Sequence, residues 1–359
     1  MRKQEKYIIG GTLLLAAATA IVDLWLQSEE QIKKDNRLTW ETYNGLRTLK
    51  VTAIGAITGG VIGNEIYKSE FRKECMDSFS SDRFIRNALK NESIKSNVYK
   101  HAEVKIVKSD VKNTLFQAFS DDLVTFPEDV GSLAKGTALD STYDIDIVLP
   151  IKRYNRFGSL SNMSTAIHNK IENLYRDKAV VTRKKKATNI LFCNLSAPIS
   201  VDVVYGRETG NYLNDKKLKL YTRPDYFWQS GKHFKTDIGI QKHLLVNKPK
   251  VREVIKAFKL YFKKNHIPVE NALIDQLVFE AMSPKNYGTN SSVTENFLNC
   301  MDYISQKMGN NVIRDYANSN NNLLQKIDNF SRGAIIDLLN SDLEKIEVDS
   351  HYLREAFQF

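Results

Sequence analysis

Cysteine and histidine are scarce in this sequence, with three cysteines and six histidines among 359 residues. Cys75, Cys193 and Cys300 lie far apart, and no cysteines or histidines have the short spacing of a zinc site. An odd number of dispersed cysteines also argues against a disulfide framework. The chain is therefore expected to work in a reducing, cytosolic environment.

Acidic residues are in deficit: 52 Lys and Arg residues stand against 42 Asp and Glu residues, and the net charge is +10. This balance favours polyanionic partners such as nucleotides, nucleic acid or an anionic membrane surface. With 42% apolar and 26% charged residues, the composition is that of an ordinary globular protein. The length allows two modest domains and an appendage.

Long apolar runs are absent beyond the N-terminal region. The segment from Tyr7 to Leu26 has 20 residues and a single charge, on Asp23, which is the length that crosses a bilayer. A second uncharged stretch, from Val51 to Asn64, is long enough to span a bilayer only if the flanking residues from Leu46 to Tyr67 are included. Together they predict a membrane anchor over residues 1–67, a hairpin of transmembrane helices at about 7–27 and 46–67. The alternatives are a cleaved signal peptide for the first segment and a buried soluble helix for the second.

Glycine recurs every four residues in the second segment, at Gly55, Gly59 and Gly63. This spacing places a groove on one helix face, where another helix can approach closely in lipid. The helix that packs on this face could belong to another copy of the chain, so the face of Gly55, Gly59 and Gly63 could also form an oligomer.

Beyond the anchor, the spacing of apolar residues changes twice. It is largely helical to residue 119, shifts towards a period of two between about 123 and 205, and becomes helical again after 221. The pattern predicts an α+β protein, with a sheet-containing lobe over 68–215 and a helical lobe over 216–359. The expected strands are 144–151, 179–184, 189–195 and 199–206, and the expected helices are 96–119, 163–176, 251–265, 271–282, 291–308 and 323–343.

Acidic residues interrupt two of the apolar strands. Asp144 and Asp146 are two residues apart in DIDIVLP, so a strand directs both carboxylates to one face. Asp202 lies between two valines in ISVDVVYG. If the strands are neighbours, three carboxylates converge and need a cation, and oxygen ligands of this kind suit Mg²⁺. A lone Asp-x-Asp is more often a solvated strand end, but the three acids together indicate a two-metal site.

A glycine-containing segment, GSLAKGTALDSTYD, leads into the first acidic pair. Gly131 allows a tight turn, and the Ser132 hydroxyl with neighbouring N–H groups can hold phosphate oxygens. Eleven residues separate Ser132 from Asp144.

This order of motifs resembles the polymerase-β-like nucleotidyltransferases, in which Gly-Ser precedes an acidic pair on a strand and a third acid on a later strand. Gly136 and Thr137 supply the second Gly-Thr of the cGAS/DncV-like branch, the CD-NTases. ISVDVVYG is similar to the third-acid strand of that branch, although Tyr205 stands where proline is usual. The resemblance covers roughly residues 96–343 and is strongest at the acidic motifs.

One lysine assignment within the resemblance stays open. VREVIKAFK is similar to the helix that carries a nucleotide-contacting lysine followed two residues later by an aromatic residue. Lys256 with Phe258 fits this pattern, and so does Lys259 with Tyr261.

The resemblance implies a polymerase-β-like core with a helical lobe that closes over nucleotides. It implies template-independent synthesis of a cyclic or short linear oligonucleotide messenger from nucleoside triphosphates, by attack of a ribose hydroxyl on an α-phosphate. Bacterial members of the branch make such signals in defence against phage, and an activating protein or nucleic acid is a further expected partner. The implied residues are Asp144, Asp146 and Asp202 for catalysis and two Mg²⁺ or Mn²⁺ ions, and Gly131, Ser132, Thr137 and Lys256 for nucleotide binding.

Because such chemistry needs cellular triphosphates, we expect the cell (inner) membrane, with the catalytic domain cytoplasmic. Three other functions compete: nucleotide transfer to an RNA 3′ end, a membrane-bound nucleotide sensor without catalysis, and a nucleotidylylating toxin or antitoxin that acts on protein. The basic run at 183–186 could contact a triphosphate or nucleic acid, or only protect a strand edge. Four aromatic residues could stack a base but are more often core residues: Tyr205, Tyr221, Tyr226 and Trp228.

Overall fold

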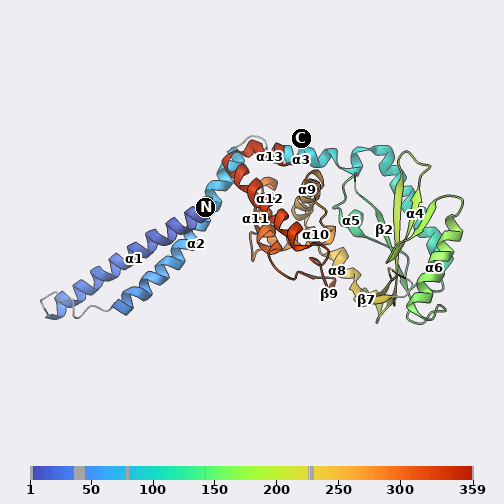
Figure 1. Cartoon of the computed structure of the whole chain (residues 1–359), viewed down its shortest axis with the longest axis horizontal. Helices are drawn as coiled ribbons and strands as arrows, with labels where there is room; N and C mark the ends of the chain where they lie inside the picture. The colour runs from blue at the N-terminus through green and yellow to red at the C-terminus, as the bar shows by residue number, and fades with distance from the viewer. Residues whose placement is uncertain are drawn as a thin grey trace. The chain divides into compact units, whose positions relative to one another are not determined.

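The computed structural model describes residues 3–35, 45–77, 81–141, 143–224, 226 and 230–357. The chain divides into two compact units, one of Met1–Ser81 with Ser341–Leu353 and the other of Asp82–Asn340 with Arg354–Phe359. Trp228 lies outside the described residues. The colour bar of Figure 1 locates each segment by residue number.

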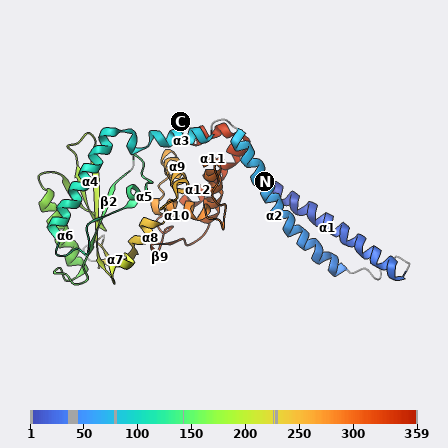
Figure 2. The same cartoon turned by 180° about the vertical axis from the view of Figure 1, so that it is seen from behind.

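The first unit contains two antiparallel helices, α1 (Lys3–Asp35) and α2 (Gly45–Asp77), which lie side by side in Figures 1 and 2. Their backbones meet at glycine: a Cβ on Gly59 would lie 2.1 Å from the carbonyl oxygen of Gly11. A Cβ on Gly63 would lie equally close, 2.1 Å, to the carbonyl oxygen of Tyr7. The face of Gly55, Gly59 and Gly63 is therefore covered by α1 of the same chain. The expected oligomer contact through this face is wrong for that reason.

Apolar character is unequal in the two helices. Among the described residues, one segment is long and apolar enough to cross a membrane, Tyr7–Leu24 in α1. The second predicted transmembrane helix is not supported, because α2 continues to Asp77 as a charged helix and fails the same criterion. Large apolar side chains are nevertheless exposed on both helices, including Leu14 and Ile57.

The acidic residue inside the apolar segment is held by a polar cluster. Asp23 is only 3% exposed. Its Oδ2 accepts hydrogen bonds from Thr48 Oγ1 at 2.5 Å and Gln27 Nε2 at 2.6 Å, and its Oδ1 pairs with Arg47 Nε at 2.9 Å. A buried carboxylate is tolerated because each oxygen has a partner.

The second unit is built on a seven-stranded mixed sheet in the order β1-β2-β5-β4-β3, with β6 pairing β5 and β7. All four predicted strands are present. The described strands β1, β6 and β7 were not predicted, and the last two extend the sheet past residue 215, where the lobe boundary was expected. The bounds are β1 Glu128–Val130, β2 Ile145–Ile151, β3 Val180–Arg183, β4 Ala187–Phe192, β5 Ile199–Glu208, β6 Lys217–Thr222 and β7 Lys232–Asp237.

Two amphipathic helices, α4 (Val98–Phe119) and α6 (Leu160–Tyr175), cover one face of this sheet (Figures 1 and 2). Alternation along β5 sends Ile199, Val201 and Val203 into their shared core, where each is fully buried. Helix α4 is capped at its N-terminus by Asn97, whose side chain accepts the Lys100 N–H at 3.0 Å. The opposite face of β2 and β5 carries Asp146 and Asp202, followed along the strands by Val148 and Val204, which pack in a smaller apolar cluster with β6.

The helical part contains α9 (Pro249–Lys264), α10 (Asn271–Ala281) and α11 (Val293–Met308), close to the predicted bounds. Phe258 and Phe297 join α9 to α11, with ring centroids 4.4 Å apart. The predicted helix 323–343 begins and ends later in the structure, where α12 spans Asn329–Val348. Residues 314–322 before it form a two-stranded ribbon. The remaining elements are α3 Ser81–Asn91, α5 Gly131–Lys135, α7 Tyr212–Asp215, α8 Ile238–His243, β8 Arg314–Asp315, β9 Asn318–Asn322 and α13 Leu353–Ala356.

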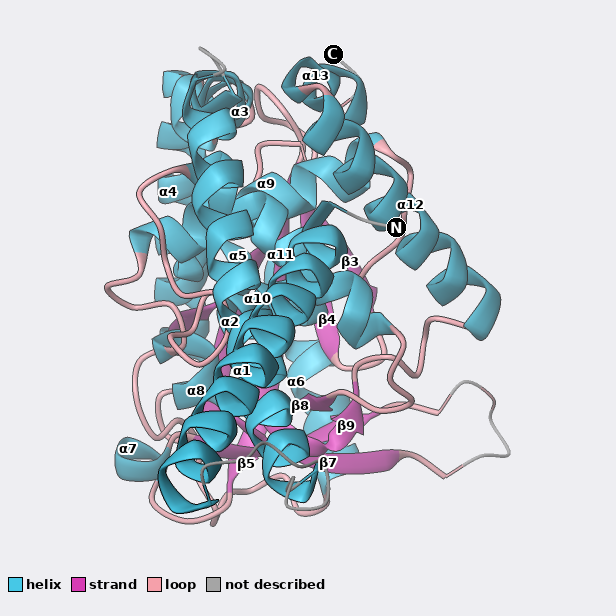
Figure 3. Ribbon diagram, turned by 90° about the vertical axis from the view of Figure 1, so that its left-hand side faces the viewer, coloured by secondary structure: helices cyan, strands magenta, loops and turns pink. Residues whose placement is uncertain are grey.

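The ribbon of β8 and β9 lies beside β7 (Figure 3). The Asp237 N–H donates to the Ala317 carbonyl at 3.0 Å, which fixes this junction. The ribbon therefore links the sheet to the helical part within the second unit.

Candidate active site

The acids of β2 and β5 meet in the middle of the sheet. The two strands are parallel neighbours, and Asp146 lies directly opposite Asp202 in the register. Both side chains project from the face opposite the core, because their strand neighbours Ile145, Ile147 and Val201 are fully buried. Asp144 immediately precedes β2 and is exposed. The predicted convergence of the two acidic strands is confirmed.

Asp146 experiences the other two carboxylates directly. Burial, followed by the charges of Asp202 and Asp144, raises the pKa of Asp146 to about 7. Lys135 and Lys184 act in the opposite direction without cancelling this effect. The three acids therefore form one electrostatic cluster that lacks sufficient positive charge.

Asp202 is held from both sides. Lys184 Nζ donates to its two oxygens at 2.7 and 2.8 Å, and Asn189 Nδ2 donates to Oδ1 at 2.7 Å. Asn189 is opposite Asp202 on β4 and also donates to Ser200 Oγ at 2.7 Å. The amide thus orients the carboxylate, and the lysine neutralises it. Lys184 belongs to the basic run, whose role at this site was left open by the sequence.

Gly131 lies against the central acid. It starts α5 with a φ of +71°, and a Cβ at this position would lie 1.8 Å from Asp146 Oδ2. Only glycine combines this conformation with this approach. Ser132 follows it in the first turn of α5, so the Gly-Ser motif lies beside the acidic strand.

Thr137 and Lys259 form a buried network behind this turn. Lys259 Nζ donates to Thr137 Oγ1 at 3.0 Å and lies 3.2 Å from Asp275 Oδ1, although the second contact lacks hydrogen-bond geometry. Lys135 pairs with the other oxygen of Asp275. Burial lowers the pKa of Lys259, which the charge of Asp275 partly restores. Thr137 is wholly buried, so it supports the turn through Lys259.

The two lysines that fit the predicted pattern lie in different surroundings. Lys259 is buried, and Asp146 is among the charges that act on its pKa. Lys256 instead lines a cavity whose lining contains none of the three acids. Which of the two lysines contacts a nucleotide stays a prediction.

The other aromatic and basic residues take ordinary positions. Tyr205 is a core residue, 4% exposed, and its hydroxyl lies 3.2 Å from Thr188 Oγ1. Tyr226 is exposed. Arg183 donates to Ser164 Oγ at 3.2 Å, which ties β3 to α6. None of these observations indicates a base-stacking role.

The acid cluster suits a divalent metal ion, because its donor atoms are carboxylate oxygens. It presents oxygen donors from three carboxylates, and the pKa of its central acid is raised by burial and by the charges of the other two acids. As they stand, no three His, Cys, Asp or Glu side chains in the described part of the chain form a ready metal cage. The Lys184 ammonium lies on Asp202 and supplies positive charge to that carboxylate.

Comparison with solved structures gives the fold. CdnC of E. coli MS115-1 with ATP is 18% identical, with a TM-score of 0.56 over 73% of this chain and 92% of CdnC. The same CdnC in a complex with HORMA-deltaN gives 18% identity and a TM-score of 0.54 over 71% and 90% of the two chains. The CD-NTase CdnG of Bradyrhizobium diazoefficiens with GTP is 10% identical, with a TM-score of 0.55 over 70% and 89%. No family model and no curated protein matches the sequence.

The chain therefore has the α+β fold of the cGAS/DncV-like nucleotidyltransferases. At these identities the likeness concerns the fold, so the chemistry must be argued from the residues. Lys184 was singled out only as part of the basic run, and three further residues of the site were not predicted from the sequence: Lys135, Asn189 and Asp275.

Proposed function

We propose that this protein is a template-independent nucleotidyltransferase that makes a cyclic or short linear oligonucleotide messenger from nucleoside triphosphates. The observation that carries the proposal is the cluster of Asp144, Asp146 and Asp202 beside Gly131. It combines acids that need a cation with a turn that can hold phosphate. The fold shared with CdnC and CdnG, solved with ATP and GTP, supports a nucleotide substrate.

In the proposed reaction, a ribose hydroxyl oxygen forms a bond to an α-phosphorus atom. The bond from that phosphorus to the pyrophosphate oxygen breaks, and the hydroxyl proton is released to solvent or a nearby carboxylate. Asp144, Asp146 and Asp202 would hold two Mg²⁺ or Mn²⁺ ions, which would supply charge stabilisation for the attacking and leaving oxygens.

The chain's own groups position the reactants. Ser132 can donate its hydroxyl to a triphosphate oxygen, and the turn at Gly131 keeps the chain close to Asp146. Asn189 fixes the orientation of Asp202. Lys184 must leave Asp202 when cations or phosphates arrive, and its flexible side chain can then contact a phosphate oxygen.

The test uses the full chain in detergent micelles with the four nucleoside triphosphates and Mg²⁺ or Mn²⁺. Phosphatase-resistant products are identified by mass spectrometry. We expect a product with the wild type and with the control Asp177→Asn, which changes an exposed acid on a turn, and none with Asp144→Asn. A product that persists in Asp144→Asn would overturn the mechanism. Extension of added RNA alone would show an RNA 3′-end nucleotidyltransferase instead.

The proposed setting is the cell membrane, with the catalytic unit cytoplasmic and α1 as the anchor. Support comes from the apolar Tyr7–Leu24 segment and from the internal pairing of Asp23, which keeps a charge away from lipid. We expect the full chain to stay in carbonate-washed membranes. Leu14→Lys combined with Ile21→Lys should release it, whereas Phe330→Lys, at an exposed apolar position outside the hairpin, should not. Release of the wild type by carbonate would contradict the anchor.

A role in defence against phage, and activation by a second protein, rest on resemblance. CdnC has been solved in a complex with HORMA-deltaN. A comparable activator is a proposal for this chain, which added activator candidates in the synthesis assay would test.

A further inference from the structure

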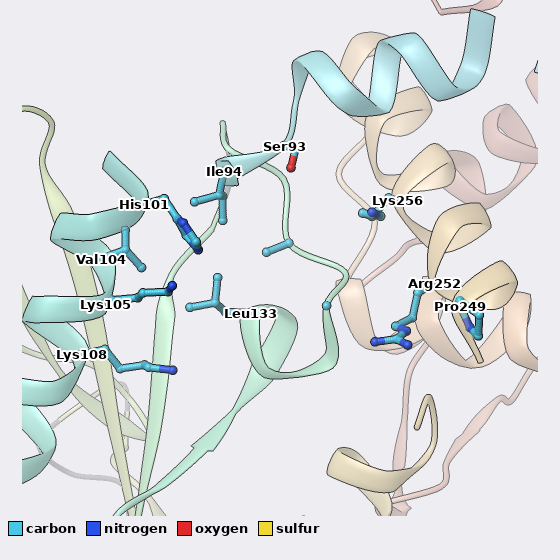
Figure 4. A pocket seen from close by; sticks show the side chains of 12 residues that line it. Ser93, Ile94, His101, Val104, Lys105, Lys108, Leu133, Pro249, Arg252 and Lys256 are labelled. Carbon is cyan, nitrogen blue, oxygen red and sulfur yellow. The ribbon is translucent and has the colours of Figure 1, made fainter. Parts of the chain in front are cut away.

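A cavity whose lining includes none of the three acids lies between α4 and α9 (Figure 4). Its volume is about 460 Å³, within the range of small-molecule sites. Its walls come from α4, the turn after α5 and the start of α9, all within the second unit.

Four permanent cations line this cavity: Lys105 and Lys108 from α4, and Arg252 and Lys256 from α9. None of the described lining residues is acidic. Lys108 is paired with Asp129 at 2.9 Å. The side chains of Lys105 and Arg252 make no hydrogen bond or ion pair with the described part of the chain. Like charges held around a small volume repel each other, and a bound anion would relieve that repulsion.

The remaining lining is largely apolar, with Ser93 and His101 as its polar side chains. In Figure 4, Lys105 and His101 of α4 extend towards Leu133, and Arg252 approaches the same turn from α9. The Arg252 guanidinium lies against this turn, because a Cβ on Gly136 would lie 3.2 Å from its Nη1. The cavity thus offers an apolar surface between two sets of cations.

We propose that this cavity binds a small organic polyanion, with two or more phosphate or carboxylate groups and an apolar body. Lysine ammonium groups and an arginine fork recognise both kinds of anion. The cavity's limited volume favours a small molecule over a nucleic-acid backbone, which needs an extended basic surface. Since Leu133 and Gly136 belong to the turn that carries Gly131 and Thr137, the ligand would contact the segment that supports the acid cluster.

The test measures binding by calorimetry with the full chain in detergent micelles. Asp144→Asn with Asp146→Asn and added EDTA suppress metal-dependent binding at the acid cluster. The probes are ATP, inorganic tripolyphosphate and citrate. Comparison of ATP with citrate separates phosphate from carboxylate sources, and comparison of ATP with tripolyphosphate shows whether the organic body contributes.

We expect at least one organic probe to bind at about one equivalent per chain. Arg252→Ala and Lys105→Ala should each weaken binding by about ten-fold or more, as expected for a charge-assisted contact. Arg252→Lys, which keeps the charge, should weaken it less and guards against misfolding. The matched control Lys263→Ala removes an exposed charge from the same helix and should change affinity by less than about two-fold.

Three outcomes would overturn the proposal. No probe binds; or binding is unchanged in Arg252→Ala and Lys105→Ala; or a 12-nucleotide single-stranded DNA binds while ATP, tripolyphosphate and citrate neither bind nor compete. The last would identify a nucleic-acid surface.

Discussion

Replacement of Gly131 by alanine tests how the turn and the central acid depend on each other. The φ of +71° is costly for any residue with a Cβ, by about 1–2 kcal/mol. The new Cβ would also lie 1.8 Å from Asp146 Oδ2, 2.5 Å from Cγ and 2.8 Å from Cβ. Rotation of the Asp146 side chain can relieve the first two contacts but not the third, because the backbone fixes the Cβ. Either β2 or the turn must therefore move.

We expect Gly131→Ala to be less stable than the wild type by the backbone cost, and by about 1–3 kcal/mol more because of the enforced displacement. Synthesis should fall by about 100-fold or more, since a shift of about 1 Å at a reacting centre has that effect. Unfolding in urea, followed by circular dichroism, gives the stability of the full chain in micelles. Mass spectrometry of products gives the activity.

Gly158→Ala is the matched control. Gly158 has a φ of +70°, and a Cβ there would meet no atom within 4 Å. Gly158→Ala should be destabilised only by the backbone cost of about 1–2 kcal/mol, and its activity should stay that of the wild type. The reasoning would be refuted if both variants lost the same stability and Gly131→Ala retained activity within about two-fold.

Three further predictions address other contacts. Lys184→Ala removes the ammonium that pairs with Asp202, so Mn²⁺ should bind up to about five-fold more tightly, as measured by calorimetry. The control Lys178→Ala should have no effect. Weaker Mn²⁺ binding in Lys184→Ala would contradict competition between this ammonium and the metal ion for Asp202. Gly59→Leu should lower the thermal midpoint of helix loss because Gly11 leaves no space, whereas Gly10→Leu, with no atom within 4 Å, should not; equal effects would contradict the close packing. Glu128 is half-buried, and the ammonium groups of Lys242 and Lys216 more than offset burial and lower its pKa below the ordinary 4.5. Its stabilisation is present above that value and is lost as pH falls through the folded-state pKa, so Glu128→Gln should cost about 1–2 kcal/mol in urea at pH 7 and progressively less on acidification, and a constant difference would contradict the linkage.

The acidic strands were predictable because their information is local. Alternation of buried valines and isoleucines with Asp146 and Asp202 sets both the strands and their faces, and the structure places the two acids opposite each other. The strands β6 and β7 were missed because their short sequences, KLKLYT and KHFKTD, contain several lysines that resemble a solvated loop. Their pairing with β5 is a tertiary effect.

The lysines of the site could not be assigned from sequence for a different reason. Their partners are remote: Lys259 bonds Thr137, 122 residues away, and Lys135 pairs with Asp275, 140 residues away. Lys256 and Lys259 are also three positions apart on α9, so they differ by only about 60° around the helix. Helical periodicity alone cannot separate them. Packing against α10 and the turn after α5 decides which lysine is buried.

The turn from Gly131 to Thr137 connects the acid cluster to the proposed anion cavity. On one side of this turn, Gly131 lies against Asp146, and Thr137 accepts a hydrogen bond from Lys259. On the other side, Leu133 and Gly136 line the cavity. The Thr137 N–H donates to the Ser132 carbonyl at 2.9 Å, which connects the two ends of this segment. Any coupling is reciprocal in binding free energy, so an anion that changes triphosphate affinity must have its own affinity changed by the same factor. Occupation of the cavity would thus be a means of setting the position of Ser132 without any contact to the three acids.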